Sequence, residues 1–431
     1  MTRRRSAAFG TALLVAALAG AWVTNARPDS PLRSVANDGA DRDVQIATWH
    51  KALAADSRSA IALGQLAALH LQRARETGGI AGYDSAEHYA RSSLAVRKDR
   101  NGASFATLGA ALVARHAFAE ADSVVTELVA VEPDVAEYRA MLGEIKLERG
   151  DYDGARIAFD SLHRMRTHLS IASRLARWME INGKPDAARK LLRDAVAEAT
   201  RRSDLPREQL AWFHLRLGDV EMRHGRMRSA RAAFADGLRI APEDHRLLSA
   251  MSRLEALEGN PRKAIEFGER AVAISFDPAS LGVVGDAHAA MGHAAEADQY
   301  YKAMEVAIQG QPSQYHRAWS LLLLDRDRTI IDVLTSARTE LKTRKDIHGY
   351  DVLAWAFHKS GRNVEARAAM AGAMRLGTRD ATMYYHAGMI EVALSDTARA
   401  RFFLQRALDI NPRFHSTRPA AVRALLDSIR G

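Results

Sequence analysis

The residues of this sequence that could do chemistry are its histidines. There are 16 of them, and two histidines bind a metal from one helical face when they stand three or four positions apart. His163 and His168 are five positions apart, and His348 and His358 are ten apart. Neither pair has the required spacing, so the sequence predicts no metal site. We expect these histidines to be exposed or packed between helices.

Paired carboxylates are the second possible source of chemistry. Glu144 with Glu148 and Asp325 with Asp327 are such pairs, but polar helix faces and loops explain them, since a catalytic pair must converge in a closed pocket. The chain also lacks a glycine-rich phosphate loop, a nucleophile elbow, a zinc-protease helix and a dinucleotide fingerprint. The sequence therefore predicts no catalytic residue, no cofactor and no enzymatic activity.

Composition narrows the fold class and the partners. Hydrophobic residues make up 47% and charged residues 26% of the 431, aromatic residues only 6%, and there is no cysteine. This composition is typical of a folded chain of packed helices and excludes disulfides and thiolate metal sites. The net charge of +9 is interleaved with acids along the chain, so we expect no nucleic-acid partner.

The amino terminus has the pattern of an export signal. Arg3 to Arg5 precede an uncharged apolar stretch from Ala7 to Val23, and polar residues follow. A signal peptide cleaved near residue 26 and an uncleaved signal anchor both fit this pattern. Either one predicts an exported chain, periplasmic or held at the inner membrane by this segment alone.

The elements that position all other residues follow from a repeat. Residues 102–133 contain Leu108-Gly109 in a first helix, then Ala121 in a second, and Pro133 at the end. The same order returns at intervals of about 34 residues. The second-helix alanines are Ala121, Ala155, Ala188, Ala230, Ala264, Ala297, Ala366 and Ala400.

This pattern closely resembles the tetratricopeptide repeat, over more than four fifths of the chain. The resemblance implies an all-α, right-handed superhelical solenoid of stacked helix-turn-helix hairpins. One copy, near 314–345, is degenerate, with Ile330 expected in its alanine position. The first copy, with Gly64 and Ala86, needs about ten extra residues that we expect in a longer loop between its helices. The predicted divisions are a signal segment 1–26, a linker 27–42, an N-terminal helix 43–57, an array of about ten repeats 58–415, and a C-terminal cap helix 416–431.

In such repeats the first helix, helix A, lines the concave face, so the resemblance implies that helix-A side chains contact the partner. A late cluster of aromatic and histidine residues is the strongest candidate anchor. Packing between adjacent repeats is, however, the favoured explanation of Trp355 and Tyr385. The predicted partner-binding residues are Arg177, Trp212, Arg253, His348, Asp351, Trp355, His358, Tyr385 and Met389.

The leading hypothesis is an exported bacterial interaction scaffold that binds a protein or peptide along this groove. The alternative is an accessory enzyme or a ligand- or metal-binding protein that uses the histidine and aromatic cluster of the C-terminal repeats. The sequence leaves open the partner's identity and the oligomeric state.

Overall fold

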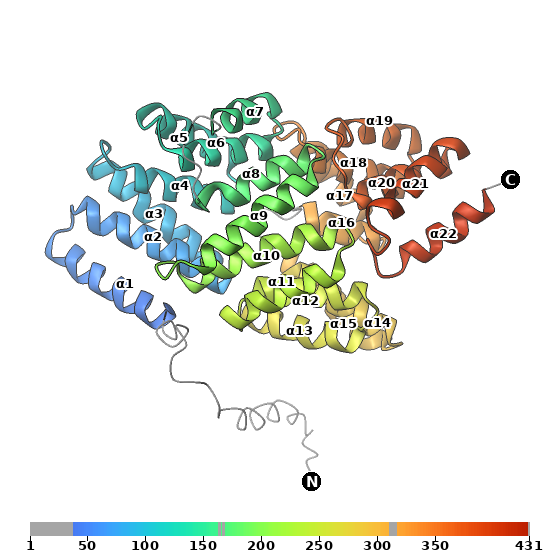
Figure 1. Cartoon of the computed structure of the whole chain (residues 1–431), viewed down its shortest axis with the longest axis horizontal. Coiled ribbons are helices and arrows are strands. Elements are labelled where there is room, and N and C mark those ends of the chain that lie inside the picture. The colour runs from blue at the N-terminus through green and yellow to red at the C-terminus, as the bar shows by residue number, and fades with distance from the viewer. Residues whose placement is uncertain (1–37, 163–164, 166–168, 310–316, 430–431) are drawn as a thin grey trace, which may run out of the picture.

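The computed structural model describes residues 38–162, 165, 169–309 and 317–429. The predicted signal segment 1–26 and His163 and His168 lie outside the described residues. Within them the chain forms 22 helices and no strand (Figure 1). None of these helices is both long enough and apolar enough to span a membrane.

Helix α1 (Asp38–Ala55) precedes ten consecutive helical hairpins. It begins within the predicted linker, at residue 38 rather than 43. The A helices are α2 (Ala60–Thr77), α4 (Gly102–Ala114), α6 (Ala136–Arg149), α8 (Leu169–Ile181), α10 (Arg207–Arg223), α12 (His245–Leu257), α14 (Pro278–Ala290), α16 (Arg317–Asp325), α18 (Ile347–Lys359) and α20 (Ala381–Ala393). The B helices are α3 (Ile80–Val96), α5 (Phe118–Val131), α7 (Tyr152–Ser161), α9 (Pro185–Thr200), α11 (Met227–Ile240), α13 (Pro261–Ile274), α15 (Ala294–Gln309), α17 (Ile330–Glu340), α19 (Asn363–Ala373) and α21 (Thr397–Ile410). Helix α22 (Arg418–Ser428) follows the last hairpin.

Small residues let the two helices of each hairpin approach closely. All eight alanines of the helix-B column are buried. In helix A, a glycine faces a large helix-B residue sixteen positions later, and a Cβ there would lie 2.2 to 2.8 Å from that side chain. The pairs are Gly109 with Val125, Gly143 with Phe159, Gly218 with Phe234, Gly285 with Tyr301, and Gly388 with Leu404. Any larger residue at these glycines would push the helices apart.

Two copies depart from the expected pattern. In the degenerate copy, Val333 occupies the alanine position rather than Ile330. Val333 is fully buried, and its N–H donates to the carbonyl of Thr329, the residue just before the helix. Ala366, which is in the alanine column, donates in the same way to the carbonyl of Arg362. In the first copy the extra residues lengthen α2 and α3 instead of forming a long loop. The connection is only Gly78 and Gly79, because Gly78 ends α2 in the left-handed conformation at φ 68°.

Successive turns of the superhelix touch each other. The C-terminal end of an A helix contacts the chain just before the A helix six hairpins later, so that α6 meets α18 and α8 meets α20 (Figure 1). In the same way, α10 meets the segment before α22. The Lys345 N–H donates to the Arg149 carbonyl at 3.0 Å, and the Ile347 N–H to the Tyr152 hydroxyl at 2.7 Å. Burial and the nearby Asp346 raise the pKa of Tyr152 to about 12, so its hydroxyl stays neutral.

A buried ion-pair cluster reinforces this contact between turns. The Arg344 guanidinium pairs with Glu148 and donates to its backbone carbonyl at 2.7 Å, while Arg317 pairs with Asp346. Burial alone would raise the pKa of Glu148, but Arg177 and Arg344 together hold it well below its usual range. Glu148 is therefore charged, and its partners come from both turns.

The glycines that end the A helices show which hairpins are covered by another turn. Gly150, Gly183 and Gly225 all have positive φ, and a Cβ on Gly150 would lie 2.3 Å from the backbone of Lys345. Gly292 and Gly361 have the same conformation, but a Cβ on either would meet nothing within 4 Å. The first group therefore requires glycine for contact between turns as well as for backbone conformation.

Candidate functional site

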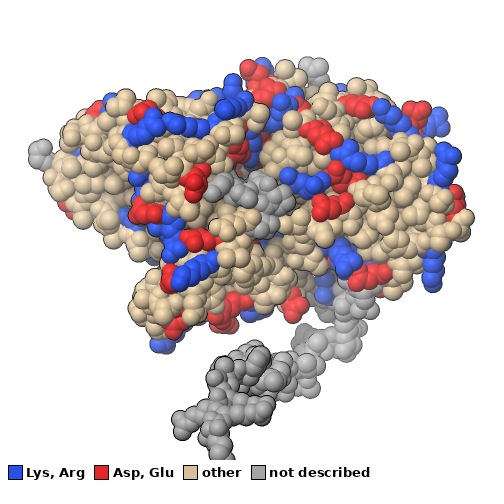
Figure 2. Space-filling view, turned by 180° about the vertical axis from the view of Figure 1, so that it is seen from behind, with Lys and Arg blue, Asp and Glu red and all other residues tan. Residues whose placement is uncertain are grey.

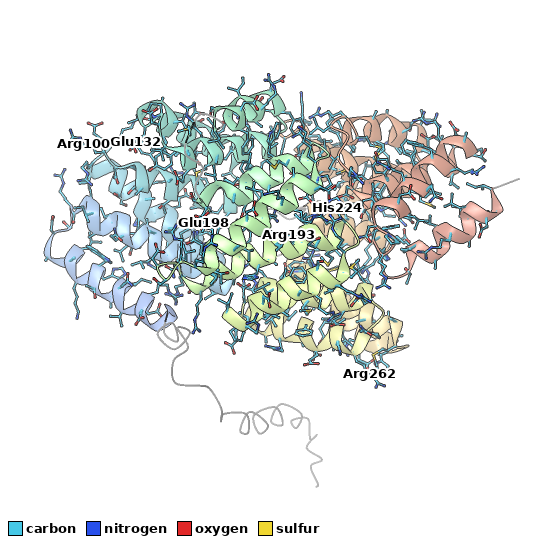
Figure 3. The ribbon with its side chains drawn as sticks, viewed as in Figure 1. Arg100, Glu132, Arg193, Glu198, His224 and Arg262 are labelled. Carbon is cyan, nitrogen blue, oxygen red and sulfur yellow. The ribbon has the colours of Figure 1, made fainter. Side chains whose placement is uncertain are left out.

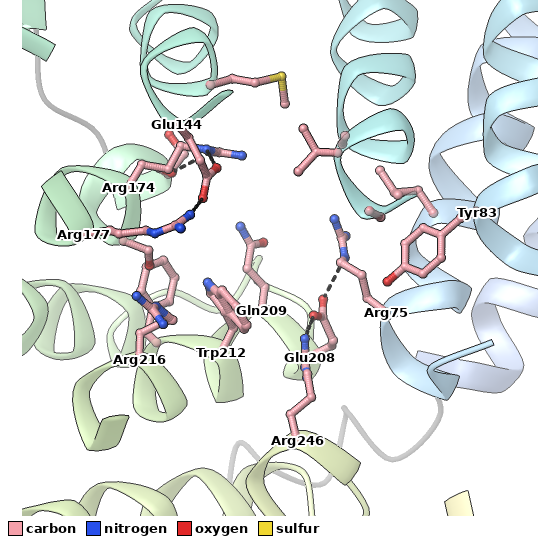
Figure 4. Close-up of a pocket in the computed structure, with 18 of the residues that line it drawn as sticks. Arg75, Tyr83, Glu144, Arg174, Arg177, Glu208, Gln209, Trp212, Arg216 and Arg246 are labelled. Atoms are coloured by element: carbon pink, nitrogen blue, oxygen red, sulfur yellow. Dashed lines mark hydrogen bonds and ion pairs between the residues drawn. The ribbon is translucent and has the colours of Figure 1, made fainter. Parts of the chain in front are cut away.

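The first six A helices, α2 to α12, surround one cavity of about 640 Å³, here called the early cavity (Figure 4). Apart from Gly78 and Tyr83, every residue that lines it belongs to an A helix. This agrees with the expectation that helix A lines the concave face. Of the predicted partner-binding residues, Arg177 and Trp212 lie in its wall.

Among the side chains that line the early cavity, arginines outnumber carboxylates. Three of these arginines also have a carboxylate within 4 Å behind the wall: Glu148 for Arg177, Asp219 for Arg216 and Asp244 for Arg246. Its charged residues are five arginines, Arg75, Arg174, Arg177, Arg216 and Arg246, and two glutamates, Glu144 and Glu208. Arg174 donates to Glu144 at 2.8 Å and Arg246 to Glu208 at 2.8 Å, while Arg75 lies 3.5 Å from Glu208 (Figure 4). The two glutamates are thus each shared by two arginines, since Arg177 also lies 3.5 Å from Glu144.

Arg216 is the least neutralised of the five arginines. Its nearest described carboxylate is Asp219, at 3.7 Å, beyond hydrogen-bond distance, and its side chain is 16% exposed. Burial, followed by repulsion from Arg223, lowers the pKa of Arg216. Burial also acts on Arg177 and Arg246, but neighbouring carboxylates outweigh it and raise both pKa values: Glu148 for Arg177, and Asp244 and Glu208 for Arg246. A carboxylate placed beside Arg216 would relieve this imbalance.

Trp212 lies between two of these cations. The Arg216 guanidinium carbon is 5.7 Å from the centre of its ring, and that of Arg246 is 5.3 Å away. Cations at such distances are attracted by the indole face. Trp212 and its two arginines therefore form one surface of the cavity wall.

A second, smaller cavity of about 320 Å³ lies further along the chain and is here called the late cavity. Its wall has three arginines and three aspartates, so it carries no charge excess. They are Arg223, Arg253, Arg326, Asp286, Asp325 and Asp380. The predicted residue Arg253 lies here, 43% exposed and 3.3 Å from Asp219. Arg223, another residue of this wall, is the last residue of α10 and precedes His224, which is labelled in Figure 3. The Arg223 guanidinium pairs with Glu180 at 2.8 Å.

The late aromatic residues have partners inside the chain. Trp355 is 3% and Tyr385 9% exposed, and the Trp355 Nε1–H donates to Asp325 at 2.9 Å. The C-terminal segment covers both rings, because the Phe414 ring lies 5.3 Å from Tyr385 and the Arg418 guanidinium 4.9 Å from it. Both rings are therefore packed inside the chain, as the packing alternative for these residues requires. We call the A-helix side of α16, α18 and α20, with this segment in place, the late groove.

The other predicted residues of the late copies also serve mainly as internal contacts. Asp351 is buried and lies 2.8 Å from Nδ1 of the buried His386. His358 stacks on Trp355 at 4.8 Å and lies 2.8 Å from Asn363, and burial lowers its pKa. Met389 packs against the core, and His348 is half-buried. No group of three potential metal ligands occurs among the described residues. The predicted role of these side chains in partner binding stays a prediction.

The predicted partner-binding residues do not include four of the five arginines that line the early cavity: Arg75, Arg174, Arg216 and Arg246. Arg216 stands four positions after Trp212 in α10, so helical spacing alone could have placed both on one face. Arg75 was missed because the extra turn of α2 carries it into the cavity.

Models of the tetratricopeptide repeat match residues 106–164, 215–280 and 381–414. These segments of the chain are tetratricopeptide repeats. Its hairpins, glycine positions and superhelical winding are those that this repeat implies. Tetratricopeptide-repeat proteins are in general scaffolds that bind other proteins, without enzymatic activity of their own. A search of curated protein sequences found no match.

Solved structures of other tetratricopeptide-repeat chains are similar in fold. A human IFIT1 dimer with m7Gppp-AAAA is 17% identical, with a TM-score of 0.50 over 74% of this chain and 72% of that one. Yeast Tom70 is 9% identical, with a TM-score of 0.38 over 91% of this chain and 92% of that one. A tetratricopeptide repeat protein from Parabacteroides merdae is 15% identical, with a TM-score of 0.36 over 61% of this chain and 99% of that one.

Proposed function

We propose that this tetratricopeptide-repeat protein is a scaffold that takes an extended segment of a partner protein into the early cavity. One observation carries the proposal: six A helices from six hairpins surround one open space of about 640 Å³, a volume in the range of ligand-binding sites. The late groove, in contrast, already contains the chain's own C-terminal segment.

The test is affinity capture of partners from the native cell with a Trp212→Ala variant. We expect the variant to lose a partner that the wild-type chain retains, because truncation removes the aromatic surface between Arg216 and Arg246. Phe402→Ala is the matched control, since Phe402 is an aromatic residue on α21, 63% exposed and outside both cavities. A partner that stays bound to Trp212→Ala would place the binding surface elsewhere.

We further propose that the scaffold works outside the cytoplasm, periplasmic or anchored at the inner membrane. This rests on the arginine-rich start and the apolar stretch from Ala7 to Val23. Fusing residues 1–26 to alkaline phosphatase, which is active only after export, tests it. An inactive fusion, beside an active one carrying a known export signal, would contradict the proposal.

A further inference from the structure

The two cavities differ in charge, and this difference points to the chemistry of the partner. We propose that the segment bound in the early cavity is acidic, with aspartate or glutamate side chains, and that Arg216 binds one of its carboxylates. This inference rests on the proposed function, and it adds the chemical class of the partner. Its first support is the wall itself, where five arginines face two glutamates.

The second support is the geometry around Arg216. A guanidinium has five N–H donors, yet the nearest described carboxylate, Asp219, is 3.7 Å away and also lies 3.3 Å from Arg253. Arg174 and Arg246, in contrast, each donate to a wall glutamate at 2.8 Å. Arg216 thus has unused donors and an under-neutralised charge facing the cavity, which fit a bidentate carboxylate.

Neighbouring polar and aromatic groups extend this site. The Trp212 ring lies beside Arg216 in the cavity wall, where it can contact the aliphatic part of a bound side chain. The Ser173 hydroxyl, in the same wall, is buried and has no hydrogen-bond partner in the described part of the chain. It can donate to a second acceptor, so the cavity provides donors for more than one carboxylate or carbonyl.

An acidic peptide fits this lining better than a nucleic acid does. A polynucleotide carries a phosphate on every residue and needs a continuous basic track. Glu144 and Glu208 interrupt the arginines of the wall, and basic and acidic residues are interleaved over the outer face shown in Figure 2. A peptide can space its carboxylates to avoid the two glutamates.

The experiment is isothermal titration calorimetry of the folded chain with two peptides of equal length. One is acetyl-(Asp-Glu)3-amide, and the other is acetyl-(Asn-Gln)3-amide, which has nearly the same shape without charge. We expect the acidic peptide to bind at least tenfold more tightly, and its affinity to fall as salt rises from 50 to 300 mM. Equal binding of the two peptides would contradict the inference.

Two arginine variants locate the site. Arg216→Gln should weaken binding of the acidic peptide about tenfold, whereas Arg253→Gln should change it less than twofold. The pair is matched, because both arginines lie near the same carboxylate, Asp219, but only Arg216 lines the early cavity. Equal losses in both variants would mean that general surface charge attracts the peptide. If circular dichroism shows that Arg216→Gln is unfolded, Arg216→Lys, which keeps the charge, replaces it. The affinity of Arg216→Lys for the acidic peptide should lie between that of the wild type and the value expected for Arg216→Gln.

Other outcomes separate this inference from the proposed function. If neither peptide binds while Trp212→Ala still loses a captured partner, the acidic segment is wrong and the scaffold proposal stands. If capture also fails to depend on Trp212, both are wrong. A single-stranded RNA hexamer that binds more tightly than the acidic peptide would overturn the inference in favour of nucleic acid.

Discussion

The early cavity and the late groove are built by the same kind of helix but differ in what fills them. In the early cavity Trp212 lies between two arginines and faces open space. In the late groove Trp355 is buried beneath the chain's own C-terminal segment, and Arg418 pairs with Asp325 at 2.6 Å. Position within the repeat therefore places a side chain on the concave side. Whether it can reach a partner depends on what another part of the chain places there.

The two regions also differ in the charged residues that they present. The late groove presents Asp325 and receives an arginine from the same chain, while the lining of the early cavity contains more arginines than carboxylates. At Asp325 the groove supplies the carboxylate and the bound segment supplies the arginine. In the contact that we infer for the early cavity, the wall supplies the arginine and the bound segment supplies the carboxylate.

The largest expected effect comes from truncating the two tryptophans. Trp355→Ala should lower the free energy of unfolding by about 3 to 5 kcal/mol, because it leaves a cavity in the core and removes the indole N–H that donates to Asp325. Trp212→Ala should cost about 1 kcal/mol. Urea unfolding followed by circular dichroism measures both. Equal losses would mean that Trp212 is also a core residue, and the comparison would fail.

The next largest effect should come from disturbing the contact between successive turns of the superhelix. Gly150→Ala should cost about 2 to 4 kcal/mol, from the left-handed backbone and from the collision with Lys345. Gly361→Ala has the same backbone strain but meets nothing within 4 Å, so it should cost only about 1 kcal/mol. Thermal unfolding of the two variants gives the contribution of the contact as their difference. No difference would show that the turns do not touch here.

A smaller effect is expected on removing the charge that closes the late groove. Arg418→Gln should cost about 2 kcal/mol, because it leaves the half-buried Asp325 without its cation. Arg423→Gln is a suitable control, since Arg423 is an exposed arginine on the same helix and donates to a backbone carbonyl at 3.2 Å. Hydrogen exchange of α16, α18 and α20 should rise in the first variant only. An unchanged exchange rate would mean that α22 does not hold the groove closed.

The smallest effect is a pH dependence of the late groove. Burial, followed by the nearby Arg418, lowers the pKa of His415 to about 4 in the folded chain, despite the opposing charges of Asp325 and Asp286. An unfolded histidine binds a proton near pH 6.5, so this stabilising contribution is present above pH 6.5 and is lost as pH falls toward 4. Because the ring is partly exposed, we expect a loss of about 1 kcal/mol.

Unfolding at pH 7.5 and 5.0 measures this loss, and His415→Gln should reduce the difference between the two pH values. An unchanged difference would assign it to the other histidines whose pKa burial lowers, such as His245 of the early cavity and His358.

The repeat and its core were predictable from the sequence, because small residues recur where helices must approach, as at Gly218 beneath Phe234. The degenerate copy was misassigned at Ile330 because a valine replaces the alanine, and spacing alone could not locate the helix start. The accessibility of Trp355 was not predictable either. It depends on Phe414 and Arg418, which follow the last repeat and lie outside the repeat pattern.

The contact between Glu148 and Arg344 joins residues 196 positions apart, which also sets an order of events during synthesis. At about 5 to 20 residues per second, a ribosome needs roughly 10 to 40 seconds to extend the chain by that distance. Throughout this interval the end of α6 lacks the partners that come from the later turn, although Arg177 of the next hairpin can already pair with Glu148. Stacking of hairpins can therefore keep pace with translation, while the joining of turns must wait for the second half of the chain.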